Sequence, residues 1–164
     1  MAFFRIKKIK GNEYLYLVEN EWKRKTSRQK VTCYLGKIHR FEKANDTDFL
    51  SFRKIENIEL YVQSNSYEKT IKDLVEWEIS QLKIGNDFSV DFENVSATIK
   101  NKRAVVAIKN GFLCDMILKN LIKFQKEDEE TDGKRLARCF IESGIDIPQE
   151  LFIAIFNKMH PHKN

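Results

Sequence analysis

The chain has 164 residues, a net charge of +5 and 42% hydrophobic residues. This length fits one domain, or one domain with a small addition, and the apolar content is sufficient for a core. No segment approaches the roughly 18 apolar residues of a membrane span, and the first residues are charged too early for a secretion signal. We therefore expect no membrane association, and we predict a cytoplasmic location.

The charge is unevenly distributed along the chain. Residues 1–45 carry 12 Lys and Arg against 4 Glu, whereas residues 46–164 carry 17 Lys and Arg against 20 Asp and Glu. Concentrated positive charge indicates the chemistry of a partner and says little about the fold. We therefore divide the chain into a basic module, residues 1–45, and a core, residues 46–164.

The basic module is rich in residues that favour β-strands. Phe3–Lys10, Tyr14–Val18 and Val31–Leu35 are predicted strands, the first two joined by a turn at Gly11-Asn12. A polar, charged connection over residues 23–28 separates the second strand from the third. Three strands with short links predict an antiparallel meander.

Alternation along these strands predicts two different faces, because successive side chains of a strand point to opposite sides. A register shift of one residue would exchange the faces. We expect the outward face to carry Tyr14, Tyr16, Lys30 and Tyr34, and the inward face to carry Leu15, Leu17, Val31 and Leu35.

The core begins with an ambiguous segment and a clear helix. Residues 46–64 have apolar residues at helical spacing, although 58–62 also fits a strand. A continuous apolar stripe predicts a helix over 67–84, with Ser64 or Ser66 as its N-cap and Gly85 as its stop.

The rest of the core predicts a second hairpin and three helices. Residues 88–92 suggest a strand, and 97–100 and 104–109 flank a basic hairpin tip. Helices are expected over 114–125, 134–143 and 149–159, with a solvated acidic linker over 126–130 and with Gly144 and Pro148 as helix-end signals. The predicted fold class is α+β: a three-stranded antiparallel meander, a central helix, a second β-hairpin and a C-terminal helical cluster.

The motifs of common enzymes are absent from the sequence. It contains no GxxxxGK[ST], GxGxxG, HExxH or GxSxG. A metal-dependent nuclease could use Asp87 or Asp91 with Lys109, but Ala107 occupies the position where the second carboxylate is needed. We therefore predict a non-enzymatic protein without a catalytic residue, a cofactor or a metal site.

Three cysteines, Cys33, Cys114 and Cys139, lie far apart and among apolar neighbours. No CxxC motif or Cys/His cluster is present. We expect three buried free thiols in a reducing compartment.

The last two predicted helices could form a helix-turn-helix, but the second of them is almost entirely apolar over Leu151–Phe156. A recognition helix needs polar and cationic side chains where it meets bases. Core packing or dimerisation is the better interpretation. A protein–protein adaptor, or a homo-oligomer formed through this helix, is therefore the alternative function.

The basic module combines positive charge with interleaved aromatics, among them Trp22. Lys and Arg neutralise phosphates, a β-ribbon fits the major groove, and exposed aromatic rings stack on unpaired bases. We predict a nucleic-acid-binding protein, with duplex DNA favoured over RNA. The predicted contacts are Arg5, Lys7, Lys8, Lys10, Tyr14, Tyr16, Lys23, Arg24, Lys25, Arg28, Lys30, Tyr34 and Lys37, with Lys102 and Arg103 at the second hairpin.

The module also resembles a known family. The segments Arg5–Glu19 (RIKKIKGNEYLYLVE) and Arg28–Ile38 (RQKVTCYLGKI) are similar to the β-rich leader of DDE-type insertion-sequence transposases. The resemblance covers about the first 40 residues, and the remainder resembles no family. Because the rest of the chain is too short for the catalytic domain and lacks a spaced acidic triad, the resemblance implies DNA contact through the leader and not transposition.

Overall fold

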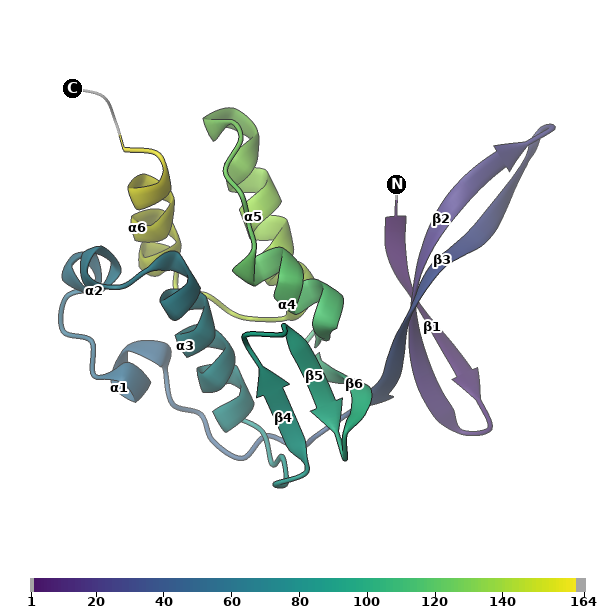
Figure 1. Cartoon of the computed structure of the whole chain (residues 1–164), viewed down its shortest axis with the longest axis horizontal. Helices are drawn as coiled ribbons and strands as arrows, with labels where there is room; N and C mark the ends of the chain where they lie inside the picture. The colour runs from purple at the N-terminus through teal and green to yellow at the C-terminus, as the bar shows by residue number, and fades with distance from the viewer. Residues whose placement is uncertain (1, 162–164) are drawn as a thin grey trace.

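The computed structural model describes residues 2–161, which form a seven-stranded mixed sheet and six helices (Figure 1). The sheet order is β1-β2-β3-β6-β5-β4, and β7 pairs with β6. This arrangement confirms the predicted α+β class. The strands are β1 (Ala2–Ile9), β2 (Asn12–Lys23), β3 (Thr26–His39), β4 (Phe88–Asp91), β5 (Ser96–Ile99), β6 (Lys102–Ile108) and β7 (Gly111–Leu113).

The helices lie together on one side of the molecule, and the strands β1–β3 extend on the other (Figure 1). Among residues 2–161, none of these helices is both long and apolar enough to span a bilayer. The helices are α1 (Phe49–Arg53), α2 (Ile58–Ser64), α3 (Tyr67–Ser80), α4 (Asp115–Ile122), α5 (Glu129–Ser143) and α6 (Gln149–Met159).

The meander is confirmed, but its second hairpin is much longer than predicted. The expected polar connection over residues 23–28 is wrong, because β2 and β3 continue to Lys23 and Thr26. Only Arg24 and Lys25 form the turn, with φ of 44° and 72°. Such positive φ values are typical of the two-residue type I′ turn, whose twist matches that of the strands.

The base of the meander is fixed to the rest of the molecule. The end of β3 pairs in parallel with β6, with Lys37 beside Ala104 and His39 beside Val106. Phe4 packs edge-on against Phe112 of β7, with 6.3 Å between ring centroids. Burial, and then the charge of Lys37, lowers the pKa of His39. One continuous sheet therefore runs from the meander into the body.

Three helix boundaries differ from the prediction, one of them the end of α4, which lies at Ile122 and not at 125. Ser66 caps α3 as expected, accepting a hydrogen bond from the Lys69 N–H, but the helix ends at Ser80 and not at 84. Beyond it, Leu82 forms a β-bridge with Lys43, which draws the chain into an extended conformation. The acidic segment 126–130 is not only a linker, because α5 begins at Glu129. Acidic side chains in the first turn of a helix stabilise its positive end.

Two short segments were also misjudged. Residues 58–62 are helical, so the strand interpretation is wrong, and Asn57 caps this helix by accepting from the Leu60 N–H. The three-residue strand β7 was not predicted, since the pattern gave it no alternation to detect.

Candidate nucleic-acid interface

Three tyrosines gather on one face of the meander, as the alternation predicted. The Tyr16 and Tyr34 rings lie 5.2 Å apart between centroids, and the Tyr14 and Tyr34 rings lie 6.3 Å apart. Tyr16 and Tyr34 are paired directly across β2 and β3. Burial, followed by the neighbouring Tyr16 and Tyr14, raises the pKa of Tyr34. We call this side of the sheet the tyrosine face.

Three of the predicted cations share the tyrosine face. Arg5 lies opposite Tyr16, while Lys7 and Lys37 flank Tyr14 on its two sides. The Lys7 Nζ sits 4.5 Å from the centroid of the Tyr16 ring, a cation–π contact. Cations and rings thus alternate across three strands. Because the rings also pack against one another, only Tyr34 is classed as exposed, at 45%.

The predicted positions of Lys30 and Val31 are wrong. The pairing between β2 and β3 skips two residues of β3, Leu35 opposite the Leu15–Tyr16 step and Thr32 opposite the Leu17–Val18 step. The strand β3 therefore contains two bulges. After the second bulge, Val31 pairs with Val18 on the tyrosine face and is 44% exposed. Lys30 moves to the opposite face, because each extra residue reverses the alternation beyond it.

The remaining inward residues behave largely as predicted. Leu15 and Leu35 are buried in the core, and Leu17 is partly buried against it. Val18 lies on the tyrosine face, yet it is fully buried between Phe3 and Val31, its cross-strand partners. The narrow sheet therefore has an apolar strip on both faces at its midpoint.

Beyond Val18, the β2–β3 hairpin projects as a ribbon over residues 19–30, which we call the arm (Figure 1). Apart from Glu19, which still pairs with Ala2 of β1, this ribbon is two-stranded. It carries five Lys and Arg against two Glu, and nearly all its residues are exposed. Lys30 and Arg28 lie opposite Glu19 and Glu21, so the root of the arm is close to neutral on that face. The excess positive charge of the arm concentrates at the tip, in Lys23, Arg24 and Lys25.

The other predicted cations lie apart from the arm tip. Lys8 faces away from the tyrosines and pairs opposite Glu13, and Lys10 occupies the β1–β2 turn. Lys102 begins β6 near the base of the meander, and Arg103 forms an ion pair with Asp115 at 3.2 Å. The predicted set is therefore spread over the tyrosine face, the arm, the other face and turn of the β1–β2 hairpin, and β6, and it does not form a single patch.

Many of these cations have no partner within the protein. Among residues 2–161, the following make no side-chain hydrogen bond or ion pair: Lys8, Lys10, Arg24, Lys25, Arg28, Lys30, Lys37 and Lys102. Their charge is thus available to an external anion. Lys23, by contrast, lies 3.5 Å from Glu21 in an exposed ion pair, which holds it only weakly.

No protein-family model, no curated protein and no solved structure matches the chain.

Trp22 was named in the sequence as part of the aromatic pattern but was left out of the predicted contacts. Its side chain is 79% exposed near the arm tip, more than any other large hydrophobic residue described in 2–161. The sequence did contain an indication, because Trp22 is an even number of residues from Tyr16 and therefore points to the same face of a continuous strand. It was missed because the strand was expected to end before it.

The residues considered in the sequence as a possible nuclease site, Asp87 or Asp91 with Lys109, do not form a common site. Asp91 accepts hydrogen bonds from the backbone N–H groups of Glu93 and Asn94 in its own turn, and Asp87 lies 3.8 Å from Lys100. Lys109 instead contacts Glu78 and Asp146, at 3.5 and 3.3 Å. In residues 2–161, no group of three or more His, Cys, Asp or Glu side chains is arranged to hold a metal ion.

The cysteines differ in exposure, which corrects one expectation. Cys114 is buried and Cys139 is half-buried, with pKa values raised chiefly by burial, to about 11 for Cys114. Cys33, however, is exposed. It lies on the inward side of β3 and lines a hollow between this strand and α4, so its apolar neighbours in the sequence do not bury it.

Helix α6 uses most of its apolar surface inside the protein. Leu151, Ala154 and Ile155 are buried, and Phe152 packs edge-on against Phe140 of α5. Ile153 is exposed at 48%. The helix is therefore mainly a core element, and homo-oligomer formation or partner docking through it stays a prediction.

Proposed function

We propose that this protein binds nucleic acid without chemical turnover, and that duplex DNA is its preferred ligand. The observation that carries the proposal is the arm, a projecting β-ribbon with unpaired cations at its tip. Five rungs of strand extend roughly 15 Å at about 3.3 Å per residue. The major groove of B-DNA is about 8.5 Å deep and admits such a ribbon, whereas the major groove of duplex RNA is too narrow for it.

The local chemistry of the turn supports the proposal. Type I′ turns favour Asn-Gly, because a residue other than glycine resists positive φ. Arg24 and Lys25 occupy these two positions with φ of 44° and 72°. Local folding preference therefore does not account for their presence, and a strained position retained at an exposed tip is a reason to look for a binding role.

The direct test is a salt titration of affinity for duplex DNA and duplex RNA, using the full chain. With about six cations on phosphates, the slope of log affinity against log salt should be near −5 for DNA. DNA affinity should exceed RNA affinity at equal salt. An affinity independent of salt, or no binding at low salt, would end the proposal.

Replacing the turn residues should separate folding from binding. We expect Arg24→Asn with Lys25→Gly to stabilise the arm by about 1 kcal/mol, which slows exchange of its amide hydrogens about fivefold. The same variant should lose roughly 50-fold in DNA affinity at 0.1 M salt, since two phosphate contacts are removed. Hydrogen exchange and a binding titration measure the two effects.

The matched control is Lys100→Asn with Asn101→Gly in the β5–β6 turn, where φ is 50° and 60°. It introduces the same Asn-Gly pair into a turn that lies outside the arm, and it removes one cation where the arm variant removes two. Its amides should gain some protection, although less than those of the arm because Asn101 already tolerates positive φ, and DNA affinity should change much less. Unchanged DNA affinity in the Arg24/Lys25 variant would show that the turn is not part of the interface.

A further inference from the structure

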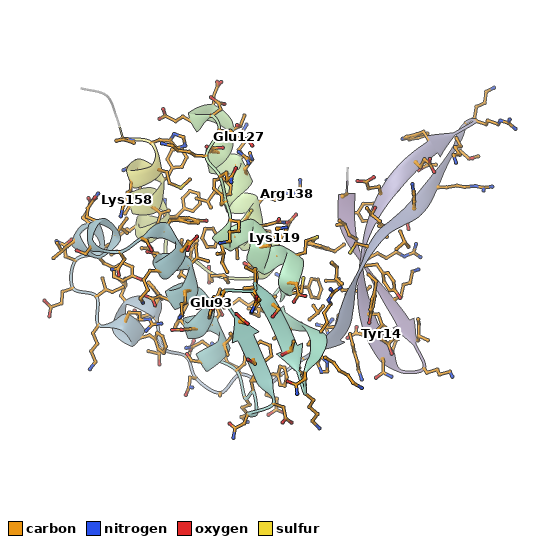
Figure 2. The ribbon with its side chains drawn as sticks, in the orientation of Figure 1. Tyr14, Glu93, Lys119, Glu127, Arg138 and Lys158 are labelled. Carbon is orange, nitrogen blue, oxygen red and sulfur yellow. The ribbon has the colours of Figure 1, made fainter. Side chains whose placement is uncertain are left out.

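A cationic groove runs along α4, on the side where that helix faces β3. A hollow of about 400 Å³ lies between α4 and the exposed part of β3. A second hollow of about 330 Å³ continues towards α5. Both are lined by Lys119 and Lys123, so the two hollows adjoin at these side chains, and we call them together the α4 groove; Lys119 is labelled in Figure 2.

The groove is apolar inside and cationic at its edge. Leu35, Val95 and Met116 line the first hollow, and most of its exposed lining is apolar. Arg103, Lys119 and Lys123 surround it, and Arg135 continues the series in the second hollow, where it stacks 5.0 Å from the Phe124 ring. This order of groups matches a nucleotide, whose flat base is apolar on its faces and whose phosphate is anionic.

The protein itself does not neutralise the middle of the groove. Lys119 makes no ion pair or side-chain hydrogen bond with any residue from 2 to 161, and Lys123 has only an exposed contact with Glu68 at 3.5 Å. The two lysines are one helical turn apart, an arrangement of like charges that destabilises a helix. An anion between them would remove this repulsion. The two acidic residues of the groove are already paired: Asp115 with Arg103 and with the Ala97 N–H, and Glu127 with Arg135 at 3.3 Å.

We propose that the α4 groove holds a single-stranded nucleic-acid segment, with phosphates at Lys119 and Lys123 and an unpaired base over Leu35 and Met116. This inference rests on the proposed function and extends it, because the arm and the groove share β3. A duplex held by the arm would pass its unpaired end into the groove. The protein would then recognise a junction between double-stranded and single-stranded nucleic acid.

Cys33 lines this groove and provides a built-in reporter. Its thiol is exposed, whereas Cys114 is buried. We expect short oligothymidylate to slow alkylation of Cys33 by iodoacetamide, read by peptide mass spectrometry. At about ten times the Kd, mass action leaves roughly a tenth of the grooves empty, so the rate should fall about tenfold. Blunt duplex DNA should protect Cys33 far less.

Two variants separate the groove from the arm. Lys119→Ser with Lys123→Ser should abolish the protection of Cys33 by the single strand, while affinity for blunt duplex changes little. Replacing Lys23, Arg24, Lys25 and Arg28 with Ser should instead weaken the affinity for blunt duplex, while the single strand still protects Cys33. The control for loss of charge is Lys54→Asn with Lys83→Ser. Lys54 directly follows α1, a helix that lies far from the meander in Figure 1, and its φ of 54° suits Asn.

The outcomes distinguish this inference from the proposed function. Duplex binding without protection of Cys33 by the single strand overturns the groove and leaves the arm. Protection of Cys33 without duplex binding overturns the arm and leaves the groove as a single-strand site. Protection that persists in the Lys119/Lys123 variant also overturns the assignment, since the strand would then approach Cys33 by another route.

Discussion

Replacing Gly144 with alanine should lower the free energy of unfolding by at least about 3 kcal/mol, a large part of the total stability of a domain this size. Gly144 ends α5 with φ of 76°, in the left-handed region. A Cβ added there would lie 1.9 Å from the carbonyl oxygen of Ile108. Because that atom belongs to the backbone, no side-chain rotation can relieve the collision.

Gly144 and Gly111 each lie against the backbone of the other's segment, so two backbones cross here at close contact. A Cβ added to Gly111 would lie 2.0 Å from the Gly144 nitrogen. The β6–β7 turn and the end of α5 thus touch without any intervening side chain. Substitution at either glycine must separate the hairpin from the helix, and would disturb the central strand β6 that carries the meander.

Three glycines allow the backbone effect and the collision to be measured separately. Gly85 has no atom within 4 Å of an added Cβ and no left-handed φ, so alanine there should change stability by less than about 0.5 kcal/mol. Gly11 has φ of 81° but open space, so alanine should cost about 1 kcal/mol. Urea unfolding followed by circular dichroism gives all three values. A Gly144 variant no less stable than the Gly11 variant would contradict the predicted collision.

The helix ends at Ser66 and Gly144 and the tyrosine face could be predicted because their causes are local. Ser66 and Gly144 act through the backbone of their own turns, and the alternation of Tyr14 and Tyr16 is set by the strand itself. Such signals need no knowledge of distant residues.

The two bulges in β3 could not be predicted for a related reason. Neither Thr32 nor Leu35, the residues skipped by the pairing, is a glycine or another marker of irregular backbone. A bulge depends on how the strand must twist against its partners, and the sequence of one strand does not contain that information. The misplacement of Lys30 and Val31 followed directly.

The α4 groove was beyond sequence reasoning because it joins three separate segments. Lys119 and Lys123 were recognisable only as polar positions in and directly after a helix with a broad apolar face. Their position opposite Cys33 depends on the parallel pairing of β3 with β6, which brings together residues more than 60 positions apart. Long-range pairing of this kind leaves no local pattern.

Removing the charge of the arm should weaken binding to duplex DNA by about a thousandfold at 0.1 M salt. The variant carries Ser at Lys23, Arg24, Lys25 and Arg28. Each phosphate contact contributes about 0.9 to the slope of log affinity against log salt, so loss of four contacts should change the slope from about −5 to about −2. Stability should change little, because all four side chains are exposed. Fluorescence anisotropy at several salt concentrations measures affinity and slope together.

Exchanging Lys and Arg at the same four positions provides the charge-conserving control. Phosphate contacts depend mainly on charge, so this variant should keep both the slope and the affinity for arbitrary duplex sequence. Full loss of binding in the control as well would mean that the substitutions disturb the arm itself, which circular dichroism and amide exchange would reveal.

The charge-conserving control also tests whether the arm tip contacts bases in the DNA major groove. Arg contacts guanine through two parallel hydrogen bonds, and Lys does not reproduce that geometry. Loss of affinity for selected sequences only, with an unchanged salt slope, would therefore assign Arg24 or Arg28 to base readout. Equal affinity for all sequences would assign the arm to the phosphate backbone, leaving Trp22 as the exposed side chain placed to contact bases. Replacing Trp22 with serine in the charge-conserving variant would then test that role without altering the electrostatic part of binding.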